Sequence, residues 1–412
     1  MSGTLANHEE IVGRDVLEHL RQLAQPLEGL RVVHVNSTRV GGGVAEILTK
    51  LVPFMVELGI DAAWEVIDGD ADFFASTKGF HNALQGIPVR ITEAQLRHYE
   101  AVNESNWLRL QPVLEEADFV FIHDPQPAAL VSLARKRRGK WVWRCHIDLS
   151  HPYRPVWKYL RPYAARFDAS IFSTPDFAQR LPHPVFIIPP SIDALSEKNI
   201  DLPAEEVVST EEHLGIDPER PLILQVSRFD RFKDPLGVIR AYALAKRFIP
   251  TLQLGLAGGE AADDPEGASV LEEVREAAAG DPDIHVLMLP ADANRTINAL
   301  QRAAVVGLQK SLREGFGLTV TESMWKGKPV IGGNVGGIRL QVVNHETGFL
   351  VDTPEGAALR IRYLLFNEGE RLRIGRQAKE FVRENFLITR NLREYLTLIV
   401  ALLHGADGRI EL

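Results

Sequence analysis

The stretch Val305–Glu322, VVGLQKSLREGFGLTVTE, has the pattern of a strand, a glycine turn and a helix in immediate succession. Its apolar start, Val305–Leu308, is short and rich in valine, as buried strands are. Glycines on both sides of Phe316 predict a sharp turn whose backbone amides can approach a ligand closely. A helix is expected to begin near Leu318. Because a strand that leads through a tight turn into a helix is the unit of α/β folds, the same unit is expected elsewhere in the chain.

Short apolar runs rich in valine and isoleucine recur along the chain. The predicted strands are Arg31–Val35, Ala62–Ile67, Asp118–His123, Trp141–His146, Ala169–Phe172, Val185–Pro189, Leu222–Val226, Leu252–Ala257, Ile284–Leu289, Val305–Leu308, Pro329–Gly332 and Gly348–Val351. The helices expected between them include Val44–Leu58, Ala128–Lys136, Val156–Ala165, Leu236–Arg247, Val270–Ala279, Arg295–Ala303 and Leu318–Trp325. Continuously apolar runs are typical of strands buried on both faces, and their alternation with helices predicts parallel, doubly wound sheets.

The series of strands starts a second time after a polar stretch, Asp193–Pro218. With a length of 412 residues, this restart predicts two Rossmann-like domains, residues 1–215 and 216–388, that face a deep cleft. The tail, Glu355–Leu403, has the pattern of successive helices, and the last of them, at about 389–405, can pack back on the first domain. Ligands of such sheets bind beyond the carboxyl ends of the strands, where loops meet helix N-termini.

The composition excludes several other classes of protein. The chain is 45% hydrophobic and 25% charged, as soluble globular proteins are, and a formal net charge of −9 does not favour binding to nucleic acid. The single cysteine, Cys145, excludes an intrachain disulfide framework and a cysteine-based zinc site. The N-terminus lacks the pattern of a secretory signal, and the most apolar late stretch, Leu396–Leu403, is too short to span a bilayer. We therefore expect a cytoplasmic protein that binds no membrane.

Two loops that follow predicted strands have the chemistry to bind phosphate. The first carries three glycines, Gly41–Gly43, directly before a helix, and a helix N-terminus favours an anion. A flexible turn explains this loop equally well. In the second loop, Arg228 and Lys233 lie five residues apart, so both cations can reach one diphosphate. The alternative there is a solvated basic loop, in which Asp230 and Asp234 reduce the local charge.

Two carboxylates bracket the glycine turn. Glu314 precedes the turn and Glu322 follows it in the helix, with seven residues between them. Carboxylate oxygens accept hydrogen bonds from hydroxyl groups, so two separate hydroxylated groups could be held. The alternative is an acidic helix start that the helix dipole favours. That alternative leaves the rest of the twelve-residue pattern, Ser311–Glu322, unexplained.

Two histidines occupy equivalent positions after neighbouring predicted strands. His123, followed by Asp124, ends one strand, and His146, followed after Ile147 by Asp148, ends the next. Side chains at the carboxyl ends of strands are expected to point into the cleft rather than into the core. A structural role for each histidine remains an alternative. A metal site is rejected, because no third ligand has a convincing spacing.

Taken together, these segments resemble retaining GT-B glycosyltransferases of glycosyltransferase family 4. Glu314 and Glu322 are similar to that family's E-x7-E motif, and Arg228 with Lys233 resembles its diphosphate clamp. The family's usual continuation is matched by GKPVIGGNVGG (Gly327–Gly337) and ETGFLV (Glu346–Val351). One position differs, because Lys310 stands where many members carry proline.

The first half resembles one group within that family, the trehalose glycosyltransferring synthases. The matching segments are VNSTRVGGGVAEIL (Val35–Leu48), FHNALQG (Phe80–Gly86), HDPQPAAL (His123–Leu130), WRCHIDLS (Trp143–Ser150) and PPSIDALSEKN (Pro189–Asn199). The resemblance implies reversible transfer of glucose from ADP-, UDP- or GDP-glucose to free D-glucose, with α,α-trehalose as the product. It implies no required cofactor, although Mg2+ can stimulate by neutralising phosphate. A homodimer is compatible with it.

The resemblance also implies roles for individual residues. The catalytic set is Arg228, Lys233, Glu314 and His146. The donor-binding set is Gly42, Gly43, Arg228, Lys233, Leu289, Gly315, Phe316, Gly317, Leu318 and Glu322. The acceptor-binding set is Asn36, His81, Asn82, Gln85, His123, Asp124 and Asp148. No residue is assigned to a metal.

Retention of the donor's α configuration raises the question of mechanism. Two carboxylates could serve as an acid and a nucleophile, as in glycoside hydrolases. The resemblance instead makes Glu314 and Glu322 binders of hydroxyl groups, which favours substitution on the front face with the departing diphosphate accepting the proton. Alternatives remain open: another retaining GT-B transferase with a sugar-phosphate or glucan acceptor, a trehalose phosphorylase, a sugar-nucleotide epimerase, and a non-catalytic regulator that binds a sugar nucleotide.

Overall fold

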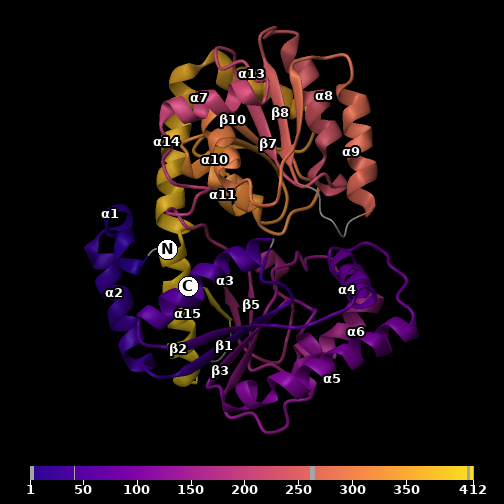
Figure 1. The fold of residues 1–412 in the computed structure, drawn as a ribbon, viewed down its shortest axis with the longest axis vertical. Coiled ribbons are helices and arrows are strands. Elements are labelled where there is room, and N and C mark those ends of the chain that lie inside the picture. Colours follow the sequence, from indigo (N-terminus) through magenta and orange to yellow (C-terminus); the bar gives the residue numbers. More distant parts are fainter. Residues whose placement is uncertain (1–3, 41, 260–264, 406–408, 412) are drawn as a thin grey trace. The chain divides into compact units, whose positions relative to one another are not determined.

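The chain folds into two compact units in the computed structural model, which describes residues 4–40, 42–259, 265–405 and 409–411. The first unit comprises residues 1–190 and 388–412, and the second comprises residues 191–387 (Figure 1). The polar stretch that separates the two series of strands folds with the second unit. Its helix α7 (Ala204–His213) packs on α10 (Asn294–Ala303), and the Asn298 side chain donates to the Ile200 carbonyl at 2.8 Å.

Among the described residues of the first unit, seven strands form one parallel sheet in the order β13-β6-β5-β4-β3-β1-β2. The strands are β1 Arg31–Asn36, β2 Asp61–Val66, β3 Phe119–His123, β4 Lys140–Arg144, β5 Ala169–Phe172, β6 Val185–Ile187 and β13 Arg409–Glu411. The α-helices are α1 Glu9–Val12, α2 Arg14–Ala24, α3 Gly43–Glu57, α4 Ala71–Leu84, α5 Glu93–Glu116, α6 Arg154–Ala164 and α15 Ile388–Leu403.

Alternate residues of the first sheet enter two separate cores, one on each face. Val33 and Val35 of β1 pack in the core that includes residues of α4, α5 and α6. Val32 points to the opposite face and packs in the core that includes residues of α2, α3 and α15. Helix α15 therefore covers the first sheet although it lies at the far end of the sequence (Figure 1).

In the described part of the second unit, six strands form a parallel sheet in the order β12-β11-β10-β7-β8-β9. The strands are β7 Leu222–Val226, β8 Gln253–Gly258, β9 Ile284–Met288, β10 Val306–Gln309, β11 Val330–Gly333 and β12 Gly348–Val351. The remaining α-helices are α8 Pro235–Lys246, α9 Pro265–Ala278, α11 Leu318–Trp325, α12 Ile338–Gln341, α13 Pro354–Phe366 and α14 Glu368–Asn385. Within the described ranges, no helix combines the length and the apolar character needed to cross a membrane.

The prediction of doubly wound parallel sheets is confirmed, and every predicted strand has a counterpart. One predicted helix is wrong. The stretch 128–136 forms only a 3-10 helix, Ala128–Ser132, which is followed by turns. Its backbone bonds span three residues, as from Leu130 N to Pro127 O (3.1 Å) and from Leu133 N to Leu130 O (3.0 Å). Runs bonded in this way are short.

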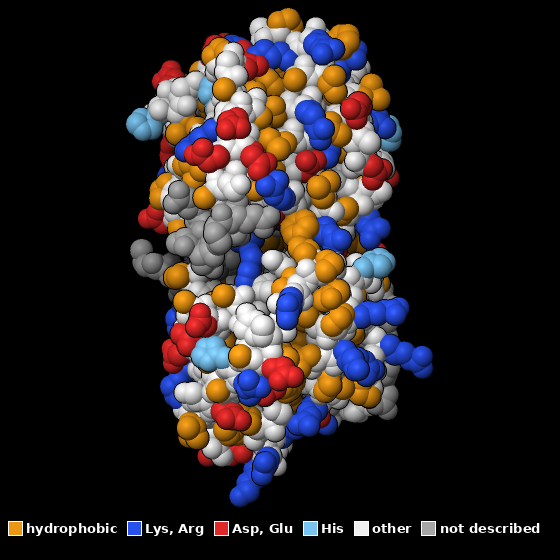
Figure 2. All heavy atoms as spheres, turned by 90° about the vertical axis from the view of Figure 1, so that its right-hand side faces the viewer, with side chains coloured by type: hydrophobic (Ala, Val, Ile, Leu, Met, Phe, Trp, Pro, Cys, Tyr) orange, Lys and Arg blue, Asp and Glu red, His pale blue; other side chains and the backbone are white. Residues whose placement is uncertain are grey.

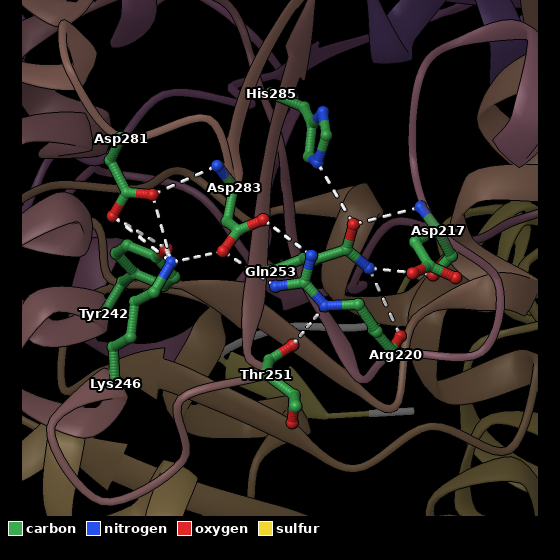
Figure 3. Close-up of polar contacts among 9 residues, drawn as sticks. All are labelled: Asp217, Arg220, Tyr242, Lys246, Thr251, Gln253, Asp281, Asp283 and His285. Atoms are coloured by element: carbon green, nitrogen blue, oxygen red, sulfur yellow. Dashed lines mark hydrogen bonds and ion pairs between the residues drawn. The ribbon is translucent and has the colours of Figure 1, made fainter.

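A polar network joins the amino ends of β7, β8 and β9 in the second unit (Figure 3). Lys246 donates to Asp281 (3.0 Å) and to Asp283 (2.6 Å), and Arg220 binds Asp283 through both terminal nitrogens at 2.7 Å. The side chain of Gln253, the first residue of β8, accepts from the Asp217 amide (3.0 Å) and donates to the carbonyls of Asp217 (2.8 Å) and Arg220 (3.3 Å). The network lies at the edge opposite to the carboxyl ends of these strands, so we assign it to stability.

We expect Asp283→Asn to lower the free energy of unfolding by about 2 kcal/mol at pH 7, because it breaks charge-assisted bonds to two cations. Bonding by Arg220 lowers the pKa of the Asp283 carboxyl. A carboxylate with a lowered folded pKa stabilises the fold above its unfolded pKa of about 3.9, and this contribution is lost as the pH falls further. Urea unfolding should therefore show the difference from the parent protein narrowing below about pH 4.

The control is Glu272→Gln, which removes a carboxylate that is mostly exposed and 3.9 Å from Arg275. It should change stability by less than about 1 kcal/mol. Loss of turnover in Asp283→Asn at unchanged stability would contradict a purely structural role.

Candidate active site

The loop after β7 is shaped by two aspartates. Asp230 Oδ1 accepts from the Phe232 amide (2.7 Å) and begins the 3-10 helix Arg231–Lys233. Asp234 has a left-handed backbone (φ 49°), and its Oδ1 accepts from the Gly237 amide (3.1 Å) to cap α8. Its second carboxylate oxygen bonds the Lys310 ammonium group, which comes from the loop after β10. Lys310 therefore ties together two loops that follow neighbouring strands.

The structure brings the predicted residues Lys233 and Glu314 into direct contact. Lys233 Nζ lies 2.7 Å from Glu314 Oε2, and both side chains are largely buried, with 18% and 9% exposed. The same oxygen accepts from the Ser311 hydroxyl (3.1 Å) and lies 3.5 Å from Gln309 Nε2. Among the described residues, none donates to Glu314 Oε1. The carboxylate is thus held through one oxygen and keeps the other available to a hydroxyl group.

The second predicted cation, Arg228, is held loosely. Its side chain is 50% exposed, and its nearest acidic oxygen is Asp230 Oδ2 at 3.9 Å. It does not join the contact between Lys233 and Glu314. An exposed guanidinium group is suited to bind an anion that arrives from solvent.

The glycine turn between β10 and α11 is packed tightly. Gly317 has a left-handed backbone (φ 84°) and immediately precedes α11, and the Gly315 carbonyl accepts from the Gly337 amide (3.1 Å). A Cβ atom at Gly337 would lie 2.6 Å from Phe316 Cα, so only glycine allows this approach. The Phe316 ring is buried against Phe386, and its carbonyl accepts from a Gln341 side chain. The turn therefore offers backbone groups, including the free amides at the start of α11, rather than the Phe316 side chain.

Glu322, the second predicted carboxylate, lies buried in α11 and does not contact Glu314. Gln301 donates to its Oε2 (3.3 Å), and Lys198 Nζ lies 3.8 Å from its Oε1. Lys326 donates to its backbone carbonyl (3.2 Å), and burial lowers the pKa of Lys326 to about 7. Lys198 and Lys326 were not predicted. Two sequence features could have pointed to them: Lys198 lies in the stretch PPSIDALSEKN, and Lys326 lies one helical turn after Glu322.

The remaining donor-side residues lie at the ends of other strands. Leu289 follows β9, is buried, and donates from its amide to the Gly258 carbonyl at 2.9 Å. Gly42 has a left-handed backbone (φ 82°) and precedes α3, which begins at Gly43. Gly41 lies outside the described residues. The glycines before α3 belong to the first unit and the other donor-side residues belong to the second.

Three histidines form a continuous hydrogen-bonded row in the first unit. His34 Nδ1 lies 3.0 Å from His123 Nε2, and His123 Nδ1 lies 3.1 Å from His146 Nε2. They come from three adjacent strands of the sheet, because His34 lies within β1, His123 ends β3 and His146 follows β4. Both ring nitrogens of His123 are therefore engaged by other histidines. His34 was not predicted, because a histidine within the apolar run RVVHV has the pattern of a core residue.

Asp124 and Arg144 lie beside this row. Asp124 has a left-handed backbone (φ 63°), and its carboxylate accepts from the His146 amide at 2.7 Å. Burial raises the pKa of Asp124 to about 6. Arg144 is fully buried, and its contact with the Ser173 hydroxyl is long, at 3.5 Å.

Four of the other predicted acceptor residues make separate local side-chain contacts, whereas Asn82 accepts through its backbone carbonyl from the Ile87 amide (3.1 Å). Asn36 accepts from the Trp64 indole (2.8 Å), and Asp148 accepts from the Ser150 hydroxyl (2.6 Å). His81 and Gln85 lie one turn apart near the end of α4, with 2.6 Å between their side-chain nitrogens. The described contacts connect none of these pairs to the histidine row.

Two further features are separate from these residues. A hollow of about 560 Å3 lies among α4, α5 and α6 and contains none of the predicted site residues. It is lined by Phe80, Pro88, Val89, Arg90, Ile91, Leu96, Tyr153, Pro155, Val156 and Tyr159. Figure 2 looks onto the side of the molecule that carries these helices and shows hydrophobic side chains gathered beside Lys and Arg. The described residues contain no group of three or more His, Cys, Asp or Glu side chains placed to hold a metal ion.

Family models match both halves of the chain. Residues 34–179 match the model of the trehalose synthase N-terminal domain, and residues 209–381 match glycosyl transferases group 1. Trehalose synthase from Thermococcus litoralis is 47% identical over 96% of both chains, and trehalose synthase from Rubrobacter xylanophilus is 43% identical over 97% of both. Trehalose phosphorylase from Pleurotus pulmonarius is 30% identical over 86% of this chain and 55% of its own length.

Solved structures with the same fold include a trehalose-phosphate synthase and a sucrose-phosphate synthase. A UDP-forming α,α-trehalose-phosphate synthase from Burkholderia xenovorans superposes with a TM-score of 0.73 at 17% identity, covering 92% of this chain and all of that one. Sucrose-phosphate synthase from Thermosynechococcus elongatus gives a TM-score of 0.68 at 17% identity, covering 91% and 100%. At this identity the likeness shows the fold alone.

Proposed function

The chain belongs to the trehalose synthase family of retaining GT-B glycosyltransferases, and on that premise we propose that it transfers glucose from a nucleoside-diphosphate glucose to free D-glucose. The product is α,α-trehalose, and the reaction is reversible. The observation that carries the proposal is the contact of Lys233 with Glu314 beside the glycine turn. It sets a cation and a hydroxyl-binding carboxylate side by side, as the diphosphate and the glucose of such a donor require.

In this proposal the second unit binds the donor. Arg228 and Lys233 bind the diphosphate, together with the amides at the start of α11. Glu314 accepts hydrogen bonds from the donor glucose through Oε1, while Lys233 and Ser311 hold its other oxygen. Glu322 binds the ribose hydroxyls, and Lys198 is placed to orient its carboxylate. The base of the nucleotide lies near Leu289.

The first unit supplies His146 beside the transferred glucose and binds the acceptor. The acceptor candidates are Asn36, His81, Asn82, Gln85, His123, Asp124 and Asp148. Because both ring nitrogens of His123 are engaged, we propose that His123 acts through His146 rather than by direct contact.

Substitution takes place on the front face of the donor sugar. The bond from the anomeric carbon to the diphosphate oxygen breaks, and a bond to the acceptor's anomeric hydroxyl oxygen forms on the same face. The acceptor's proton passes to the departing diphosphate, which leaves as the nucleoside diphosphate. The chain's main task is to stabilise the negative charge that grows on that group, a role in which fixed cations and amides are effective. The proposed reaction requires no cofactor, and Mg2+ can stimulate it by neutralising charge on the phosphates.

We expect glucose together with ADP-, UDP- or GDP-glucose to yield the free nucleoside diphosphate and a 1,1-linked disaccharide, identified by NMR of the product. Donor without glucose is the control and should release little nucleotide. A different linkage, or release that does not depend on glucose, would contradict the proposal. The relatives include trehalose phosphorylases, so phosphorolysis is the alternative to test. We expect trehalose with inorganic phosphate to give no glucose phosphate.

A further inference from the structure

The histidine row runs from the interior of the first unit to a proposed catalytic residue. His34 is fully buried, His123 is 2% exposed, and His146 is half-buried at the end of the row. The two contacts, of 3.0 and 3.1 Å, are ordinary hydrogen-bond distances. A change at His34 can thus reach His146 through a single intermediate side chain.

Burial favours the neutral form of all three imidazoles at physiological pH. Burial lowers the pKa of His34 to about 3 and lowers the pKa values of His123 and His146 well below the usual value. The nearby Arg144 guanidinium adds to this lowering for His123 and His146. A neutral imidazole has one N–H donor and one acceptor nitrogen.

Because each ring has one donor and one acceptor, the tautomer of one histidine fixes the tautomers of the other two. If His123 carries its proton on Nδ1, it donates to His146 and must accept from His34, so every ring is protonated on Nδ1. If His123 carries its proton on Nε2, every ring is protonated on Nε2. If neighbouring rings had different tautomers, two N–H groups or two unprotonated nitrogens would meet in a buried contact. At least one hydrogen bond of the row would then be lost.

The buried end of the row distinguishes the two orders. His34 Nε2 is buried and has no hydrogen-bond partner among the described residues. Protonation on Nε2 would leave a donor unpaired there, whereas protonation on Nδ1 leaves only an unpaired acceptor. Unpaired buried N–H groups are the rarer of the two in proteins. The order with every proton on Nδ1 is therefore favoured, and it turns the Nδ1–H of His146 out of the row.

We propose that His34 and His123 are positioning residues that fix His146 as the Nδ1–H tautomer, so that it presents a hydrogen-bond donor to a sugar oxygen. The sugar partner rests on the function proposed above, whereas the tautomer does not. Packing alone does not call for this row. His34 stacks on Phe121 at 4.7 Å between ring centroids, a place that an apolar side chain could fill without a buried polar group.

The tautomer can be measured on the full-length protein without substrate. Nitrogen NMR of 15N-histidine-labelled protein distinguishes Nδ1–H, Nε2–H and charged rings, and single substitutions assign the signals among the 13 histidines. We expect the Nδ1–H form for His34, His123 and His146. An Nε2–H or charged His146 would overturn the proposal, whether or not the protein transfers glucose.

Substitution of His34 tests the direction of control. His34→Leu removes the donor to His123, so the His146 signal should split between tautomers and turnover should fall about 10-fold or more, as when outer-shell partners of a functional histidine are lost. His34→Asn places an amide N–H near the position of Nδ1 and should restore both the single tautomer and most of the turnover. An unchanged His146 spectrum in His34→Leu would overturn the proposal.

The control is His183→Leu, because His183 is a histidine of the same unit, half-buried where His34 is fully buried, and it bonds Ser170 (2.7 Å) outside the row. It should leave the His146 spectrum and the turnover unchanged. Thermal unfolding of all variants separates a loss of stability from a change of tautomer. Equal losses of turnover in His183→Leu and His34→Leu would assign both to stability and overturn the positioning role.

Discussion

Glu314→Gln should lower kcat by about 100- to 1,000-fold, the loss typical when one fixed group that stabilises a transition state is removed. The carboxylate accepts from Lys233 and Ser311 through Oε2, and in the proposed function this fixes Oε1 where it accepts from the donor sugar. An amide cannot accept equally well at both positions, and it leaves the Lys233 ammonium group unpaired. Steady-state kinetics with the preferred donor and glucose measure the loss.

A double variant separates chemistry from stability in this experiment. Each single change, Glu314→Gln or Lys233→Met, leaves one charge of a largely buried ion pair without its partner, so Tm should fall in both. The double variant removes the unpaired charge and should recover part of the lost Tm without recovering turnover. Full turnover in Glu314→Gln would exclude a role for this residue in binding the donor.

Arg228→Ala should lower kcat by about 100-fold or more and leave Tm unchanged. The side chain is half-exposed and its nearest acidic partner is 3.9 Å away, so the folded protein without ligand gains little from it. In the proposed reaction its charge stabilises the departing diphosphate. Arg228→Lys keeps the charge but loses the planar fork, and it should recover only part of the turnover.

Arg231 provides the matched control on the same loop. Its guanidinium group is also about half-exposed, but it is already paired with Glu273 at 2.6 Å. Arg231→Ala should therefore leave kcat nearly unchanged. If Arg228→Ala raises only the KM for glucose, the assignment of Arg228 to the diphosphate is wrong.

The strands could be predicted because parallel strands buried on both faces are continuously apolar. Helix α11 begins and ends at the predicted residues, since the glycine turn before it and the lysine and glycine after it mark both boundaries. Helix α5 was missed because its 24 residues are largely polar and include Pro112. Its limits depend on a capping box at Thr92 and on packing against α4, which local apolar periodicity does not report.

The candidate site, too, was predicted only in part from the sequence. Lys233 and Glu314 were each predicted from the loop that follows a strand, but their direct contact arises because β7 and β10 are neighbours in the sheet. The row from His34 to His146 depends on the lateral order of β1, β3 and β4, which a single sequence does not specify. Lys198 reaches Glu322 from the polar stretch between the two series of strands, so neither local pattern predicted this contact.

The path of helix α15 has a consequence for how the chain is made on the ribosome. Leu392, Leu396 and Ile399 of α15 complete a core whose members outside the helix come from the first half of the chain. Residues 191–387 form a continuous unit, so they can fold while synthesis is still under way. The first unit, although synthesised earlier, cannot close that core until its final helix has left the exit tunnel. A chain released before α15 is complete would keep an open apolar face, which chaperones and proteases recognise.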